Sequence, residues 1–143
     1  MKIRPIALGF FEHRGRILLQ QYWHEPEQYH FFRLAGGGIE FGESAAEAMR
    51  REAREELSAE ISDPELVAVF ENLFEYGGDP KHEIVFIFRA QLLNDELLAA
   101  DEFTMADDGL SFRAVWVPRE EILAGQHVVY PVRFREMLLR GEL

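Results

Sequence analysis

The chain has 143 residues, 48% of them apolar and 13% aromatic, which is enough to bury the core of one domain. Its formal net charge of −11 argues against non-specific binding to nucleic acid polymers, because such binding depends on Lys and Arg neutralising backbone phosphates. The absence of Cys excludes disulfides, a thiolate nucleophile and Cys-ligated metal. No signal sequence or membrane-spanning apolar run is found, so we expect a cytoplasmic protein without a membrane partner.

The N-terminal third is rich in β-forming residues. The runs Ile3 to Phe11 and Arg16 to Trp23 are separated by a short turn with a glycine, which predicts a hairpin. The polar segment His24 to Tyr29 contains a proline and is predicted to be a loop. A short strand from Tyr29 to Leu34 should follow. Arg33, near the end of this strand, has two interpretations: it contacts a phosphate, or it is an ordinary exposed arginine at the end of a strand.

A glycine-dense turn then leads into an amphipathic helix. Gly36, Gly37, Gly38 and Gly42 permit positive φ and let the backbone approach a ligand. The helix should begin after Ser44, which forms a capping box with Glu47. Small and apolar side chains recur at helical spacing and give the helix a narrow face that can pack on a sheet; these are Ala45, Ala48, Met49, Ala53 and Leu57.

Three glutamates share another face of this helix. Glu52, Glu55 and Glu56 fall at i, i+3 and i+4, so their carboxylates project from one side. Each like-charge pair at this spacing destabilises a helix by a few tenths of a kcal/mol unless solvent or a cation neutralises it. Mg²⁺ is commonly held by a few carboxylates while it contacts substrate phosphates. The pattern therefore favours a divalent metal site, and the alternative is a solvated acidic face.

Beyond Asp63-Pro64, which should break the helical pattern, two strands are predicted. They are Leu66 to Phe74 and His82 to Leu92, joined by a turn from Tyr76 to Pro80. The run Ile84 to Phe88 is continuously apolar, which is typical of a strand covered on both faces. We therefore expect it near the centre of the sheet.

The C-terminal third is less regular. Asn94 to Gly109 is acidic and is predicted to be irregular, and Ser111 to Val117 is predicted to be the last strand. Pro118 should open a short helix through Leu123 as an N1 proline, and Val132 to Leu139 has a final helical pattern. Strands interleaved with two or three helices indicate an α/β fold with a mixed sheet.

The segment from Gly37 to Ala59 resembles the signature of the Nudix hydrolases: Gly, five residues, Glu, seven residues, Arg-Glu-apolar-any-Glu-Glu, then any-Gly-apolar. All six fixed positions before the closing triplet agree, namely Gly37, Glu43, Arg51, Glu52, Glu55 and Glu56. Three features depart from the pattern. Ser58 replaces the closing glycine, the apolar positions are only Ala53 and Ala59, and Ala35 stands where many members have Pro. The first two departures concern how the helix ends and packs, whereas the carboxylates are complete.

The resemblance implies a fold and a reaction. The fold is an α/β/α sandwich with a mixed central sheet, formed by one domain over residues 1–143. The reaction is the attack of water on phosphorus to cleave a nucleoside diphosphate linked to another moiety, with Mg²⁺ or Mn²⁺ as the cofactor. Divalent ions orient phosphates, neutralise their charge and activate water, so the negative charge of the chain does not exclude such a substrate.

The resemblance also assigns roles to residues. Glu52 and Glu56 correspond to the principal metal ligands, Glu55 to a further ligand or a water-orienting carboxylate, and the carbonyl of Gly36 to the group that completes the set. Glu43 and Arg51 flank the helix and are expected to pair, which would hold the acidic face in place.

Substrate contacts are harder to assign. Family members often supply a further acid from the loop before the last strand, where Asp107 and Asp108 lie, although Asp-Asp-Gly is also an ordinary turn sequence. Glu83 is either a charge at the start of a strand or a contact to substrate or metal. Tyr76 lies where some members that act on dinucleoside polyphosphates carry a Tyr, but aromatic residues on strands more often belong to the core.

The leading expectation for the substrate is a nucleoside triphosphate, oxidised or unmodified. The alternatives are a dinucleoside polyphosphate, an ADP-sugar, or no turnover at all in a nucleotide-binding regulator of the same fold. Homodimers are frequent among relatives, so a second copy of the chain is the partner to consider.

Overall fold

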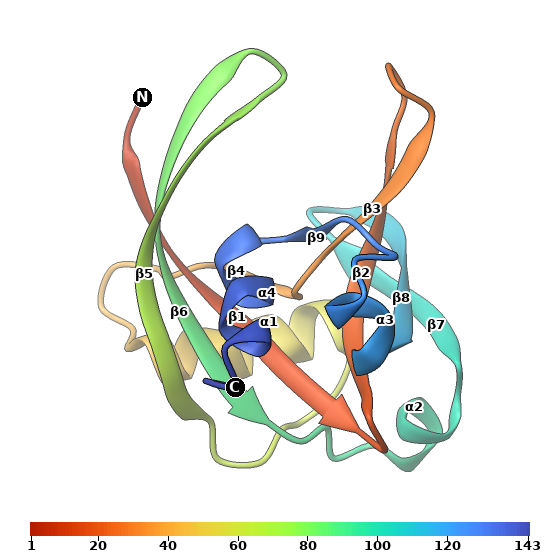
Figure 1. The fold of residues 1–143 in the computed structure, drawn as a ribbon. Helices are drawn as coiled ribbons and strands as arrows, with labels where there is room; N and C mark the ends of the chain where they lie inside the picture. The colour runs from red at the N-terminus through yellow and green to blue at the C-terminus, as the bar shows by residue number, and fades with distance from the viewer.

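The computed structural model describes residues 1–143 and shows a large mixed sheet with helices on both faces (Figure 1). The elements in chain order are β1 (Ile3–His13), β2 (Arg16–His24), β3 (Tyr29–Arg33), β4 (Gly36–Gly38), α1 (Ala45–Leu57), β5 (Glu65–Tyr76), β6 (Asp79–Ala90), α2 (Asp95–Ala99), β7 (Glu102–Asp107), β8 (Leu110–Pro118), α3 (Arg119–Leu123), β9 (Val129–Tyr130) and α4 (Val132–Leu139). None of the four helices combines the length and the apolar content that crossing a membrane requires.

Strand β1 joins the two halves of the sheet. On one side it runs parallel to β6, which pairs with β5, and the N-terminal half of β1 also pairs with the short β4. Its C-terminal end forms the hairpin with β2, which continues to β3 and β9 on one side and to β8 and β7 on the other. The β5–β6 hairpin and the β2–β3 hairpin diverge from this junction (Figure 1). The expected mixed sheet is confirmed.

Side chains that alternate along β1 divide the core into two layers. Ala7 and Phe11 belong to the layer that contains the buried face of α1. Leu8 and Phe10 belong to the opposite layer, which includes Phe134 of α4 and a buried side chain of α3. Because a strand places successive side chains on opposite faces, this alternation is what allows helices to cover both sides of one sheet.

Most predicted elements are present. The first hairpin, β3, the start of α1, and the β5–β6 pair lie where the sequence pattern places them, and α4 spans the predicted residues. Strand β6 lies inside the sheet between β1 and β5, as its apolar run indicates. The turn between β5 and β6 is shorter than predicted, because Gly77 and Gly78 both have positive φ and close the hairpin alone.

The prediction that Asn94 to Gly109 is irregular was wrong. Asn94 caps α2 by accepting a hydrogen bond from the Leu97 amide, and the side chain of Leu97 packs against the core. Strand β7 follows and pairs with β8 along its whole length. Two smaller differences concern the region after β8: Pro118 is the N-cap of α3 instead of its first residue, and β9 follows as a further strand.

Candidate active site

Helix α1 carries the acidic side chains and has well-defined ends. Ser44 Oγ accepts from the Glu47 amide at 3.1 Å, and the Glu47 carboxylate accepts from the Ser44 amide at 3.3 Å, so the predicted capping box is formed. At the other end, Ser58 adopts the left-handed conformation with φ 52° and ψ 40°. This is the conformation that glycine usually supplies at a helix C-terminus, and here a serine takes it.

The glycine turn brings α1 close to the sheet. Gly36 has φ 147°, and a Cβ at this position would lie 2.0 Å from the Ala7 carbonyl oxygen of β1. A Cβ on Gly37 would lie 2.7 Å from Oε1 of Glu52. Glycine is therefore required at Gly36, where the clash would be with backbone, whereas a Cβ at Gly37 would displace the Glu52 carboxylate from its place against the backbone.

Glu56 is the most unusual ionisable group in the structure. It is only 5% exposed, and its Oε2 has no hydrogen-bond partner. Burial raises the pKa of Glu56 to about 9, and the nearby charges of Glu52 and Asp107 act in the same direction. The pKa of Glu52 is also raised, mainly by burial, although Arg51 opposes this shift. A buried carboxyl group with one unpartnered oxygen beside a half-buried second carboxyl group is the arrangement that a cation would complete.

Arg51 holds these groups in position. Its Nη2 lies 2.7 Å from Glu43 Oε1 and its Nε lies 3.1 Å from Glu43 Oε2, so the expected pair is present as a two-point contact. The same guanidinium donates to the Gly38 carbonyl at 2.9 Å and to Glu52 Oε1 at 3.0 Å. One side chain therefore links the glycine turn, the loop before α1 and a carboxylate of the acidic face.

Asp107 joins the cluster from another part of the chain. It ends β7, and Asp108 and Gly109 both have positive φ and form the tight turn to β8. Its Oδ2 accepts a hydrogen bond from Nε2 of the buried Gln20 at 3.1 Å, and its charge contributes to the raised pKa of Glu56. The Asp-Asp-Gly sequence is thus a turn that also delivers a carboxylate to the helix.

Arg33 and Tyr22 lie at the edge of the same cluster. Burial raises the pKa of Tyr22 to about 12, and its charged neighbours include Arg33, Asp107 and Glu56. Gln20 and Tyr22 were not among the residues predicted from the sequence. The alternation of side chains along β2 could have indicated them, because it places these two polar groups on the same face as the core residue Leu18.

An open cleft of about 710 Å³ adjoins the cluster. It is lined by Arg4, Gly37, Gly38, Ile39, Glu40, Arg51, Glu52, Glu55, Glu56, Ala106, Asp107, Asp108 and Gly109. Of the other residues predicted to contact substrate, Tyr76 is exposed at the tip of the β5–β6 hairpin, and Glu83 is buried in β6. Neither of these residues nor Arg33 is among the lining residues, whereas Arg4 and Glu40 line the cleft without having been predicted.

The oxygen-rich cluster suits a hard divalent cation. No group of three His, Cys, Asp or Glu side chains is arranged to hold a metal ion by itself. Mg²⁺, however, is usually bound through one or two carboxylates, with water and substrate phosphates completing its octahedral shell. The unpartnered oxygen of Glu56, the adjacent Glu52 and the close glycine backbone match that requirement.

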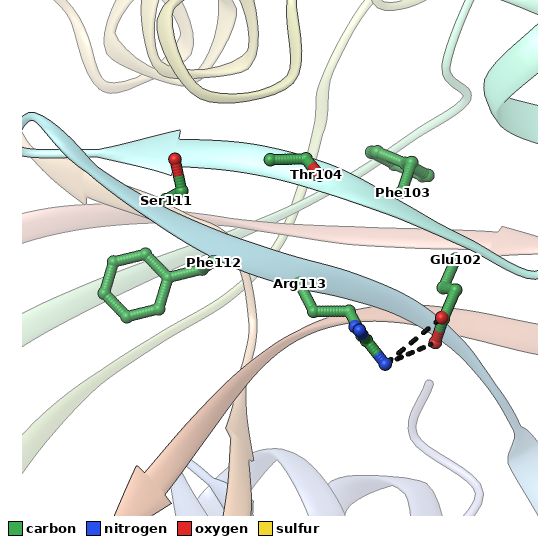
Figure 2. A pocket seen from close by; sticks show the side chains of 6 residues that line it. All are labelled: Glu102, Phe103, Thr104, Ser111, Phe112 and Arg113. Carbon is green, nitrogen blue, oxygen red and sulfur yellow. Dashed lines mark hydrogen bonds and ion pairs between the residues drawn. The ribbon is translucent and has the colours of Figure 1, made fainter.

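A second hollow lies on the β7–β8 hairpin and has a different character (Figure 2). It is lined by Glu102, Phe103, Thr104, Ser111, Phe112 and Arg113, and has a volume of about 470 Å³. Arg113 Nη1 and Glu102 Oε1 are 3.2 Å apart and pair across the two strands. Its two charged side chains pair with each other, and it holds no group of three His, Cys, Asp or Glu residues that could bind a metal ion.

Comparison with known proteins places these features in context. The NUDIX domain family model matches residues 2–136. The CTP pyrophosphohydrolase of Escherichia coli (strain K12) is 38% identical over 68 residues, which are 48% of this chain and 50% of that protein. The chain thus spans about half the length of the curated relative it matches.

Solved structures extend the likeness to the whole chain. The solution structure of the E. coli ORF135 protein has 28% identity and a TM-score of 0.59, covering 98% of this chain and 92% of that one. A NUDIX hydrolase from Nitrosomonas europaea has 20% identity and a TM-score of 0.68, covering 99% and 91% of the two chains. At that identity the second structure shows a common fold only.

Proposed function

The chain belongs to the NUDIX hydrolase family, and from this premise we propose that it is a divalent-metal-dependent pyrophosphohydrolase of nucleoside triphosphates. Members of this family generally need divalent ions. The observation that carries the proposal is the convergence of Glu52, Glu56 and Asp107 around a buried carboxyl oxygen that no protein group satisfies. A triphosphate presents the oxygens that such a charged cleft can bind only through cations.

Glu56 and Glu52 would hold the metal, with the Gly36 carbonyl completing the set and Mg²⁺ or Mn²⁺ as the ion. When bound, the metal neutralises phosphate charge and lowers the pKa of a water molecule. Glu55 is 59% exposed, so its carboxylate can reach a water in the cleft and orient it. Arg51 keeps Glu52 directed at the glycine turn.

The second wall of the cleft would act on the substrate. Asp107 can serve as a further ligand or accept the proton of the attacking water, because Gln20 fixes the orientation of its carboxylate. Arg33 and Asp107 are both charged neighbours of Tyr22, and from this position the Arg33 guanidinium would pair with a phosphate oxygen at the margin of the cleft. The likeness to a CTP pyrophosphohydrolase supports a nucleoside triphosphate as the substrate.

The test is a product-resolved screen with Mg²⁺ and with Mn²⁺. The panel contains the common and oxidised nucleoside triphosphates, dinucleoside polyphosphates and ADP-ribose. We expect a nucleoside monophosphate and pyrophosphate from a triphosphate, and an E56Q variant should lose at least about 100-fold in turnover. The matched control is E96Q, an exposed glutamate of α2 outside the cleft, which should keep full activity. Full activity of E56Q, or no hydrolysis of any nucleotide by the wild type, would refute the proposal.

A further inference from the structure

Three polar side chains form a row across β5, β6 and β1. Glu83 of β6 is in register with Arg4 of β1 on one side and with Asn72 of β5 on the other. Residues directly opposite on neighbouring strands point to the same face, with a strand spacing of about 4.8 Å. The row lies toward the β5–β6 hairpin and the N-terminus, which are on the same side of the molecule (Figure 1).

Glu83 has no partner in this row. It is only 5% exposed, and its Oε1 makes no hydrogen bond. A buried carboxyl group costs free energy unless it is paired, so an arginine on the next strand and the same face would ordinarily pair with it. No ion pair forms here. The guanidinium of Arg4 lies instead over β4, where its Nη2 would be 3.4 Å from a Cβ on Gly38.

Arg4 connects this row to the active-site cleft. It lines the cleft together with Glu52, Glu56 and Asp107, so Glu83 lies one strand spacing from the cleft wall. Glu83 itself does not line the cleft, so a ligand would reach its carboxylate only by extending past Arg4. A buried polar group without a partner calls for an explanation, and a ligand that supplies the missing partner is the one that the neighbouring cleft offers.

Building on the proposed function, we propose that Glu83 is a specificity-determining residue that accepts a hydrogen bond from the exocyclic amino group of the substrate base. A carboxyl oxygen is an acceptor and matches an amino donor, as in the pairing of Glu or Asp with the N4 amino group of cytosine. A keto oxygen in the same place is itself an acceptor, so it could not hydrogen-bond to the Glu83 carboxylate and would leave it buried without a partner. Sites of this kind discriminate strongly, because the wrong substrate leaves their polar groups unpaired. The preferred substrates are therefore triphosphates with an amino-bearing base.

The test uses substrate pairs that differ only in amino against keto, which are CTP with UTP and ATP with ITP. In whichever of the two pairs the wild type hydrolyses faster, we expect kcat/KM to be at least tenfold higher for the amino member than for the keto member. E83Q should reduce this preference to less than threefold, mainly through a gain on the keto member, because an amide can accept from an amino group or donate to a keto oxygen. The control E75Q, at the exposed end of β5, should keep the wild-type preference.

A second variant and a second readout separate recognition from folding. E83L removes a buried, unpartnered carboxyl group, so it should raise Tm while abolishing the preference. Binding of CMP against UMP, measured by calorimetry, tests the same preference without turnover. Equal use of amino and keto members by the wild type, or an equal loss on both members in E83Q, overturns this inference and leaves the proposed function standing. If no nucleotide is hydrolysed, the proposed function fails, and equal binding of CMP and UMP then overturns the role of Glu83 as well.

Discussion

The raised pKa of Glu56 predicts that the metal-free protein becomes less stable as the pH rises. Burial, together with the charges of Glu52 and Asp107, raises the pKa of Glu56 from 4.5 to about 9. Between these two values the folded state holds a proton that the unfolded state has released. Folding stability attributable to this group is therefore greatest below pH 4.5, decreases as the pH rises toward 9, and is constant above that.

The magnitude is large enough to measure. At about pH 7.5, some three units above the unfolded pKa, the linkage amounts to ~4 kcal/mol, at 1.36 kcal/mol per unit. Replacement by Gln keeps the shape of the side chain and removes the titration. E56Q should therefore be more stable than the wild type in EDTA at this pH, by up to ~12 °C in Tm at about 3 °C per kcal/mol for this chain length.

The assay is urea and thermal unfolding in EDTA at pH 5.5, 7.0 and 8.5. The wild type should lose stability across this series, and E56Q should show a much flatter profile. E55Q is the control, because Glu55 is on the same helix but 59% exposed, and it should change stability by less than about 0.5 kcal/mol. Mg²⁺ should raise the Tm of the wild type more at pH 8.5 than at pH 5.5, since it competes with the proton, and should have little effect on E56Q. Equal slopes for wild type and E56Q would refute this reasoning.

Three further substitutions test the scaffold of the site. S58G should stabilise the protein by about 0.5–1 kcal/mol, because Ser58 has φ 52°, a conformation that glycine adopts without strain. The control S111G, in the extended backbone of β8, should destabilise the protein. Equal effects of the two substitutions in urea unfolding would contradict the strain argument. R51M should cost about 1–3 kcal/mol and at least tenfold in kcat, and adding E43Q should recover stability but not kcat. G37A should lower kcat and metal affinity, since the new Cβ displaces a carboxylate 2.7 Å away; unchanged Mg²⁺ binding by calorimetry would rule this out.

Helix α1 could be predicted from the sequence because its determinants are local. The capping box of Ser44 and Glu47 spans a single turn, and the i, i+3 and i+4 spacing alone places three carboxylates on one face. The two-point contact between Arg51 and Glu43 also follows from the motif. Each of these features depends on residues close in the chain, and the structure reproduces them.

The features that were missed depend on pairing between distant segments. Helix α2 is too short to have a clear periodic pattern, and it is held by the indole of Trp116, which donates to the Leu97 carbonyl at 2.9 Å. The position of Asp107 beside Glu56 requires β7 to pair with β8, and β8 with β2. The burial of Glu83 likewise follows from strand register and not from its neighbours in sequence. The sequence alone therefore does not distinguish an acidic residue that belongs to the site from one that only forms a turn or ends a strand, because the difference depends on strand pairing.

The two unsatisfied groups differ in their chemistry and position, because Glu56 lines the cleft and Glu83 lies one strand spacing beyond its wall. The structure has two buried side-chain oxygens without a hydrogen-bond partner, Oε2 of Glu56 and Oε1 of Glu83. The first lies among carboxyl groups and needs a cation, and a cation in turn brings phosphate. The second lies in a row with an amide and a guanidinium, where a neutral donor fits better than another charge. In the proposed function a nucleotide would carry both complements on one molecule, so that a single ligand would account for two arrangements that are each unfavourable in the free protein.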